Sequence, residues 1–185
     1  MREIASKGQL RLAYFRWAIV TVPFILLLGF ASARLAPTGA ENRWYMALVK
    51  PEQMPPNWAF PVAWTALYIL LGLALALIIN ARGSRLRGPA LVVFAVQMAL
   101  NVAWTPVFFG AHLVEPALAI LGALFVAALA TTILFGQIRV LAAVMLLPYL
   151  AWIAFAGFLL YQIDQLNPDA ASLVPPRPAT QIEIR

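Results

Sequence analysis

The chain contains no cysteine and a single histidine among its 185 residues. Without cysteine it can form neither disulfides nor thiolate metal sites. The lone histidine, His112, cannot supply the roughly four ligands that a structural metal site needs. We therefore expect no metal site and take His112 to be a solvated loop residue, with axial ligation of a haem iron as the alternative.

Charge is also scarce, at 11% of the residues against 63% that are hydrophobic. Soluble domains usually carry about 25% charged residues. The charges lie between five uncharged stretches, each long enough as a helix to cross about 30 Å of hydrocarbon. The sequence predicts an all-α, multi-pass integral membrane protein, a bundle of five transmembrane helices. The stretches cover residues 17–33, 58–81, 88–113, 116–138 and 140–163.

These stretches divide the chain into three parts. Residues 1–16 form a basic N-terminal segment, residues 17–163 the transmembrane domain, and residues 164–185 a tail that we expect to be disordered. The basic segment and the small residues at 31–33 also have the layout of a cleavable signal peptide. The length of the apolar run, and Arg34 directly after it, favour a true first helix.

The distribution of lysine and arginine predicts an orientation. The side shared by the N-terminus, the second loop and the fourth loop carries more of them, which favours a cytoplasmic N-terminus in a bacterial inner membrane. Basic residues beside anionic membrane lipids account for the net charge of +6 without a nucleic-acid partner. The basic residues of this side are Arg2, Lys7, Arg11, Arg16, Arg82, Arg85, Arg87 and Arg139.

The connection between the first two predicted helices, residues 34–57, is long for a helix bundle. Pro55 and Pro56 fix φ and remove backbone donors, so this connection can fold as a stiff lid. Trp44 and Tyr45 belong either to such a lid or to an aromatic anchor at the membrane surface.

The third predicted helix has two different faces. At 100° per residue Gln97, Asn101, Trp104 and Phe108 share one face. Amides are costly against lipid, so this face should point into the bundle, either to line a cavity or to cross-link helices. The opposite face carries small residues that allow close helix contact, between two copies of the chain or inside one. These residues are Ala95, Ala99, Ala103 and Gly110.

Aromatic rings recur on two other predicted helices. Phe60, Trp64 and Tyr68 repeat every four residues along the second helix. On the fifth helix two aromatic residues lie near an alanine, whose small side chain leaves space for a flat ring. Each ring alone is explained by core packing, but together with the amides they predict a pocket for a large planar ligand. The candidate pocket residues are Phe60, Trp64, Tyr68, Gln97, Asn101, Trp104, Tyr149, Trp152 and Ala156.

The motifs around these positions, in their order, resemble the TspO/translocator protein family, also called tryptophan-rich sensory proteins, over about residues 17–163. They read WY at 44–45, PPNWAFPVAWTALY at 55–68, NVAWTPVFFG at 101–110 and PYLAW at 148–152. The resemblance implies five transmembrane helices, a homodimer, and a pocket closed by the first loop. By motif position the pocket would use Trp64, Asn101, Trp104 and Trp152, and the lid Trp44, Tyr45, Pro55 and Pro56.

The resemblance also implies the ligand, a porphyrin such as protoporphyrin IX or haem, bound for sensing, transport or disposal. One alternative is light-dependent porphyrin breakdown, which would run through the bound photosensitiser because the sequence offers no catalytic group. Another is passage of a lipophilic ligand or sterol. The chain departs from the family in two places. Gln53 of the lid stands where relatives place an aromatic residue. The pattern for sterol binding lacks its final basic residue after Tyr161.

Overall fold

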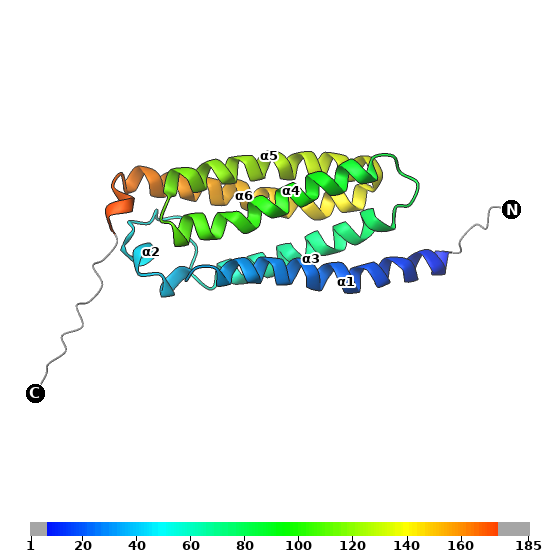
Figure 1. Cartoon of the computed structure of the whole chain (residues 1–185), viewed down its shortest axis with the longest axis horizontal. Helices are drawn as coiled ribbons and strands as arrows, with labels where there is room; N and C mark the ends of the chain where they lie inside the picture. The colour runs from blue at the N-terminus through cyan, green and yellow to red at the C-terminus, as the bar shows by residue number, and fades with distance from the viewer. Residues whose placement is uncertain (1–6, 174–185) are drawn as a thin grey trace, which may run out of the picture.

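Five long helices run side by side in the computed structural model, which describes residues 7–173 (Figure 1). Within these residues, five helices are long and apolar enough to cross a membrane, which confirms the predicted all-α transmembrane bundle. They are α1 (Lys7–Arg34), α3 (Ala59–Asn80), α4 (Arg87–Thr105), α5 (Val114–Ile138) and α6 (Val140–Leu166).

The helices form a ring in the order α1, α3, α6, α5, α4, and α4 closes it by a looser contact with α1. Short elements gather at one end of this ring, beside the end of α6 (Figure 1). We call this the lid end and keep the name lid for residues 34–57. The short elements are η1 (Gly39–Glu41) and α2 (Arg43–Ala47) within the lid, and η3 (Ala170–Leu173) after α6.

The first helix is longer than predicted. α1 begins at Lys7 rather than at residue 17, so residues 7–16 of the basic segment belong to the first helix, and residues 1–6 lie outside the described range. Basic residues interrupt this stretch, but Leu12 and Phe15 between them are 55% and 59% exposed and extend the apolar surface of the helix. Because the charged residues interrupt the apolar pattern, the sequence did not predict that the helix continues through this stretch.

The tail also begins later than predicted. α6 continues to Leu166, and η3 follows it, so the expectation of disorder is wrong for residues 164–173. Asn167 and Ala170 in this segment are buried against the bundle. Residues 174–185, the remainder of the predicted disordered tail, lie outside the described residues.

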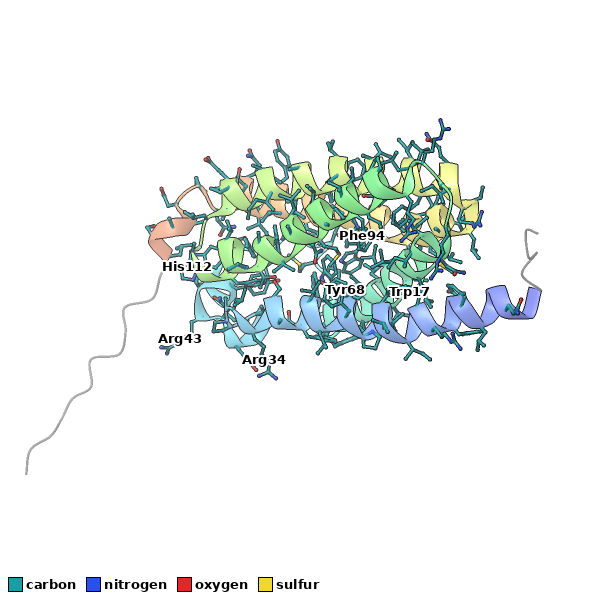
Figure 2. All side chains as sticks on the ribbon, turned by 45° about the vertical axis from the view of Figure 1, so that its right-hand side comes forward. Trp17, Arg34, Arg43, Tyr68, Phe94 and His112 are labelled. Atoms are coloured by element: carbon teal, nitrogen blue, oxygen red, sulfur yellow. The ribbon has the colours of Figure 1, made fainter. Side chains whose placement is uncertain are left out.

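Two glycines let α1 and α3 approach closely. The Thr21 hydroxyl donates a hydrogen bond of 2.7 Å to the Gly72 carbonyl, and a Cβ at Gly72 would lie 2.6 Å from the Cα of Val22. A Cβ at Gly29 would collide with the ring of Tyr68. The Tyr68 ring therefore lies against the backbone of α1, between the helices (Figure 2).

The predicted third helix ends earlier as a regular α-helix. α4 stops at Thr105 and continues as the π-helical turn η2 (Pro106–Gly110), closed by a 2.8 Å hydrogen bond from the Ala111 N–H to the Pro106 carbonyl. Proline lacks the N–H that would continue the α-helical ladder. The wider turn shifts the direction of every side chain after it, and such turns are frequent at functional sites.

Candidate functional site

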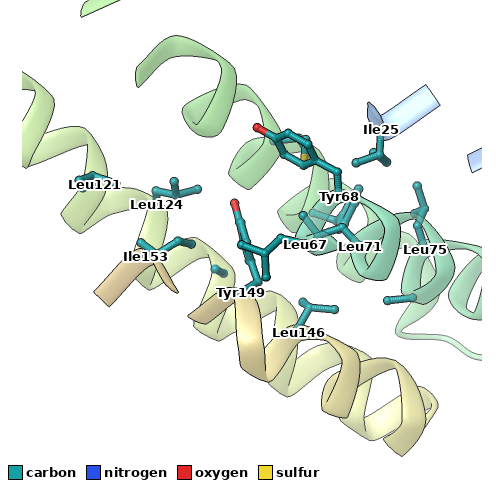
Figure 3. Packing of buried hydrophobic residues seen from close by; sticks show 14 of the residues in the cluster. Ile25, Leu67, Tyr68, Leu71, Leu75, Leu121, Leu124, Leu146, Tyr149 and Ile153 are labelled. Carbon is teal, nitrogen blue, oxygen red and sulfur yellow. The ribbon is translucent and has the colours of Figure 1, made fainter. Parts of the chain in front are cut away.

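Asn101 connects three helices through hydrogen bonds. The Tyr68 hydroxyl on α3 donates to its Oδ1 at 2.9 Å, and its Nδ2 donates to the Tyr149 hydroxyl on α6 at 3.2 Å. All three side chains are buried. Figure 3 shows the two tyrosine side chains projecting from their helices into the space between them. Asn101 therefore faces the bundle interior, as predicted, and it also cross-links helices.

The predicted rings of α3 and α6 meet beside this network. Trp64 stacks on Tyr68 with ring centroids 5.3 Å apart and presents its edge to Tyr149 at 6.3 Å. Phe60 packs edge-on against Trp152 at 5.9 Å. Phe60, Trp64 and Trp152 are half-buried. We call this set, with Tyr68 and Tyr149, the central ring cluster.

Trp104 belongs to a second group of rings under the lid. It stacks on Phe108 at 5.1 Å and meets Phe109 edge-on at 5.8 Å. Phe108 in turn contacts Trp44 and Tyr45 of the lid. The sequence suggested that Trp104 would face the same ligand as Trp64 and Trp152, yet its ring contacts connect α4 to the lid. Helical periodicity placed Phe108 on the face of Trp104 without making it a site residue, and Phe109, which meets Trp104 across the π turn, was missed.

The lid is folded onto the bundle. Trp44 and Tyr45 are buried in it, which favours a lid over an anchor at the membrane surface, whereas Trp58 after it is 68% exposed. Asn42 caps α2: its Oδ1 accepts from the Tyr45 N–H, and its Nδ2 donates to the carbonyls of Pro37 and Phe109 at 2.9 Å each. An asparagine before a short helix is a common cap signal.

The prolines and the remaining alanine of the predicted site lie at its edges. Pro55 is half-buried and Pro56 exposed at the end of the lid. Met54 beside them lies 3.8 Å from the Tyr45 hydroxyl, which donates to its sulfur. Ala156 of α6 is half-buried and packs against the core.

His112 is not the solvated loop residue that the sequence suggested. It is half-buried, and its ring stacks on Trp44 with centroids 4.5 Å apart and an angle of 24° between the planes. Its φ of 60° is left-handed, an uncommon conformation for a residue other than glycine. The turn from η2 into α5 thus directs His112 to the lid, and Figure 2 shows it at that end of the bundle.

Two polar groups of α4 are buried without a hydrogen-bond partner. Both the Nε2 and the Oε1 of Gln97 are unpaired, as is the Nε1 of Trp104. Gln97 is 0% exposed. A buried unsatisfied group costs about 1–3 kcal/mol of stability. The polar face of α4 thus has a satisfied amide, Asn101, between two unsatisfied groups.

Two grooves lie outside these clusters. One of about 360 Å³ separates the lid from the last turns of α6. The other, of about 350 Å³ and almost entirely apolar, lies between α5 and α6. The first is lined by Pro51, Glu52, Gln53, Gln162, Gln165 and Leu166, and the second by Leu118, Leu121, Gly122, Phe125, Ile153, Ala154 and Gly157.

Lys50 is the cation of the lid nearest to the rings. Its ammonium lies 4.6 Å from the centroid of the Tyr45 ring, and it donates to the Leu48 carbonyl at 3.3 Å. Partial burial lowers the pKa of Lys50 below its ordinary value, because desolvation disfavours the charged form. Within residues 7–173 no three His, Asp or Glu side chains gather as metal ligands would.

Known proteins are similar to this chain over most of its length. The model of the TspO/MBR family matches residues 19–166. The chain belongs to the TspO/MBR family. It is 39% identical over 153 residues to a tryptophan-rich sensory protein of Cereibacter sphaeroides, covering 80% of this chain and 95% of that protein.

Two further relatives show the breadth of this family. Protein CrtK of Rhodobacter capsulatus is 39% identical over 142 residues, 75% of this chain and 89% of its own length. The human translocator protein is 37% identical over 158 residues, 78% of this chain and 92% of its own length. Family membership and the five apolar helices together show an integral multi-pass membrane protein, and the family supports a ligand-binding or transport role.

We predict that Asn101→Leu destabilises the protein by about 1–3 kcal/mol, because it leaves the hydroxyls of Tyr68 and Tyr149 buried without partners. Thermal unfolding in mild detergent measures the effect. The triple variant Tyr68→Phe, Asn101→Leu, Tyr149→Phe removes every polar member and should recover most of the loss. If the triple variant is less stable than Asn101→Leu alone, the network does not act through hydrogen bonding.

Proposed function

We propose that the chain binds a porphyrin, protoporphyrin IX or haem, inside the bundle, beside the polar face of α4. The observation that carries this proposal is the unpaired amide of Gln97, with the unpaired indole N–H of Trp104 two turns further along the helix. A natural core pairs nearly all of its buried polar groups, and each exception needs an explanation. A bound ligand with polar atoms is the explanation that we propose for Gln97 and Trp104. Porphyrins combine a flat aromatic body with polar ring nitrogens and carboxylates.

The rings around this face suit a flat ligand. Trp64 and Trp152 are half-buried at the edge of the central ring cluster, where a macrocycle can stack on them. Since Trp64 packs on Tyr68 and against Tyr149, a ligand that enters must displace one of these contacts. Binding is therefore coupled to a rearrangement of the rings rather than to the filling of a rigid cavity.

Charges at the lid end complement the ligand. Arg43 is exposed there (Figure 2), and Lys50 lies half-buried over Tyr45. Carboxylates of a porphyrin would meet these cations while the macrocycle remains among the rings. The names of two relatives, a sensory protein and a translocator protein, favour sensing or transport as the use of this binding.

The distribution of basic residues supports an orientation as well. The N-terminal helix and the loops at Arg82 to Arg87 and at Arg139 carry most of the cations, at the end opposite the lid. By the positive-inside rule this end faces the cytoplasm of a bacterial inner membrane. The lid would then open on the opposite side.

We predict opposite effects of Gln97→Leu on stability and binding. The substitution removes an unpaired buried amide, so the ligand-free protein should gain about 1–3 kcal/mol of stability. Protoporphyrin affinity, measured by quenching of tryptophan fluorescence, should fall about tenfold, the effect of roughly 1.4 kcal/mol.

The matched control is Gln137→Leu, which changes an exposed glutamine in the last turn of α5. It should alter neither quantity. Unchanged protoporphyrin affinity in Gln97→Leu, with the control behaving as expected, would show that the ligand does not use this amide.

We also propose that two copies of the chain form a homodimer through the small-residue face of α4. Ala95 and Ala99 are exposed, which leaves them free for a close helix contact. Ala103 is half-buried, and the Ser32 hydroxyl of α1 donates to the Val102 carbonyl beside it at 2.7 Å. A Cβ at Gly110 would lie 3.5 Å from Ala36. The contact should therefore centre on Ala95 and Ala99.

We predict that Ala99→Leu shifts the protein toward monomer, because the larger side chain overfills a close crossing of two α4 helices. Crosslinking in native bilayers measures the dimer fraction. Ala123→Leu, an exposed alanine of α5, is the matched control and should leave the dimer intact. The reverse result, loss of the dimer only in Ala123→Leu, would move the interface to α5.

A further inference from the structure

The residue after α6 holds the backbone of the lid with its side chain. Asn167 accepts a hydrogen bond from the Val49 N–H at 2.8 Å through Oδ1, and its Nδ2 donates to the Val49 carbonyl at 2.9 Å. The same Nδ2 also donates to the Ile163 carbonyl in the last turn of α6 at 2.7 Å. One amide therefore pairs with both polar groups of a lid residue and ties them to the end of a transmembrane helix.

A second bond joins the same two segments. The indole N–H of Trp44 on α2 donates to the Ala170 carbonyl at 2.7 Å. Ala170 is placed by the turn that begins at Asn167, since its N–H donates to the Asn167 carbonyl at 3.0 Å. Asn167 thus acts twice, directly on Val49 and through Ala170 on Trp44. Figure 1 shows η3 and α2 together at the lid end.

The bonds between Val49 and Asn167 are suited to opening and closing. Val49 is 56% exposed and these two bonds are only partly buried, so water can take the place of the Asn167 amide when the lid lifts. A hydrogen bond that water can replace has a small net free energy, unlike a fully buried bond. The pair between Val49 and Asn167 is therefore well formed in the closed state but can be broken reversibly.

The groove between the lid and α6 lies next to this connection. Pro51 to Gln53 line one side, two residues after Val49, and Leu166, the neighbour of Asn167, lines the other. The lid is thus already separated from α6 along this edge, and the Val49–Asn167 pair is where the two segments are joined. Breaking the pair would widen the groove toward the rings beneath the lid.

We propose that Asn167 and the residues that follow it, 167–173, form a latch that holds the lid closed and sets how fast the ligand enters and leaves. The identity of the ligand rests on the proposed function, but the mechanical part of the latch, its hold on the lid, does not. Asn167 acts as a positioning residue: it touches the lid and not the rings. The segment after α6 thereby controls a site whose rings come from α3, α4 and α6.

Hydrogen exchange of the full-length protein in bilayers tests the mechanical part. Asn167→Ala should raise the exchange of residues 43–50 about tenfold, the change expected for loss of about one net hydrogen bond. Asn167→Asp keeps the acceptor for the Val49 N–H and should give a smaller rise; it also serves if the alanine variant does not fold. Trp44→Phe keeps a ring against Phe108, loses the bond to Ala170, and should act in the same direction.

Stopped-flow binding of protoporphyrin tests the control of access. In Asn167→Ala both the association and the dissociation rate should rise about tenfold, while the dissociation constant changes less than about threefold, because a latch changes a barrier more than the bound state. Ser32→Ala removes a comparable 2.7 Å hydrogen bond between α1 and α4, and should change neither exchange in the lid nor these rates.

Unchanged exchange of residues 43–50 in both Asn167→Ala and Trp44→Phe would overturn the latch. Faster exchange with unaltered protoporphyrin rates would overturn its control of access. Failure of the unmodified protein to bind protoporphyrin would instead refute the proposed function, and the exchange measurement would still decide whether the C-terminal segment holds the lid.

Discussion

The constraint on which the structure depends is that a buried amide in a membrane protein needs hydrogen-bond partners that lipid cannot provide. Asn101 meets it with two tyrosine hydroxyls from different helices, so α3, α4 and α6 must converge at one level of the bundle. Gly29 brings α1 to the same level, because the Tyr68 ring lies where a side chain would otherwise be. The arrangement of four helices thus follows from one polar residue and the space around its partner.

Gln97 and Trp104 share this face of α4 with Asn101, but they differ from it in hydrogen bonding. Their polar atoms are buried but unpaired, so the protein accepts a cost in stability at this place. A site for a polar ligand lowers the stability of the protein in this way as long as the ligand is absent. The contrast between the satisfied Asn101 and its unsatisfied neighbours separates a residue that holds the bundle together from the residues that we propose for ligand binding.

The sequence predicted the fold through local patterns: uncharged stretches defined the spans, and helical periodicity placed Gln97 and Asn101 inward. It failed where distant segments decide the structure. A lone asparagine after α6 resembles an ordinary helix end, yet Asn167 pairs with Val49, 118 residues away. Likewise, no local pattern shows that His112 stacks on Trp44 or that Phe108 packs edge-on against Trp44. The sequence placed Tyr68, Asn101 and Tyr149 in one site, but it did not predict the hydrogen bonds between them.

The most direct test of the proposed site is a structure of the protein with protoporphyrin bound in a lipid bilayer. We expect the macrocycle among α3, α4 and α6, in contact with Trp64 or Trp152. One of its polar atoms should lie within hydrogen-bond distance of the Gln97 amide or the Trp104 indole N–H. A macrocycle bound in the apolar groove between α5 and α6, with Gln97 still unpaired, would contradict the proposed site.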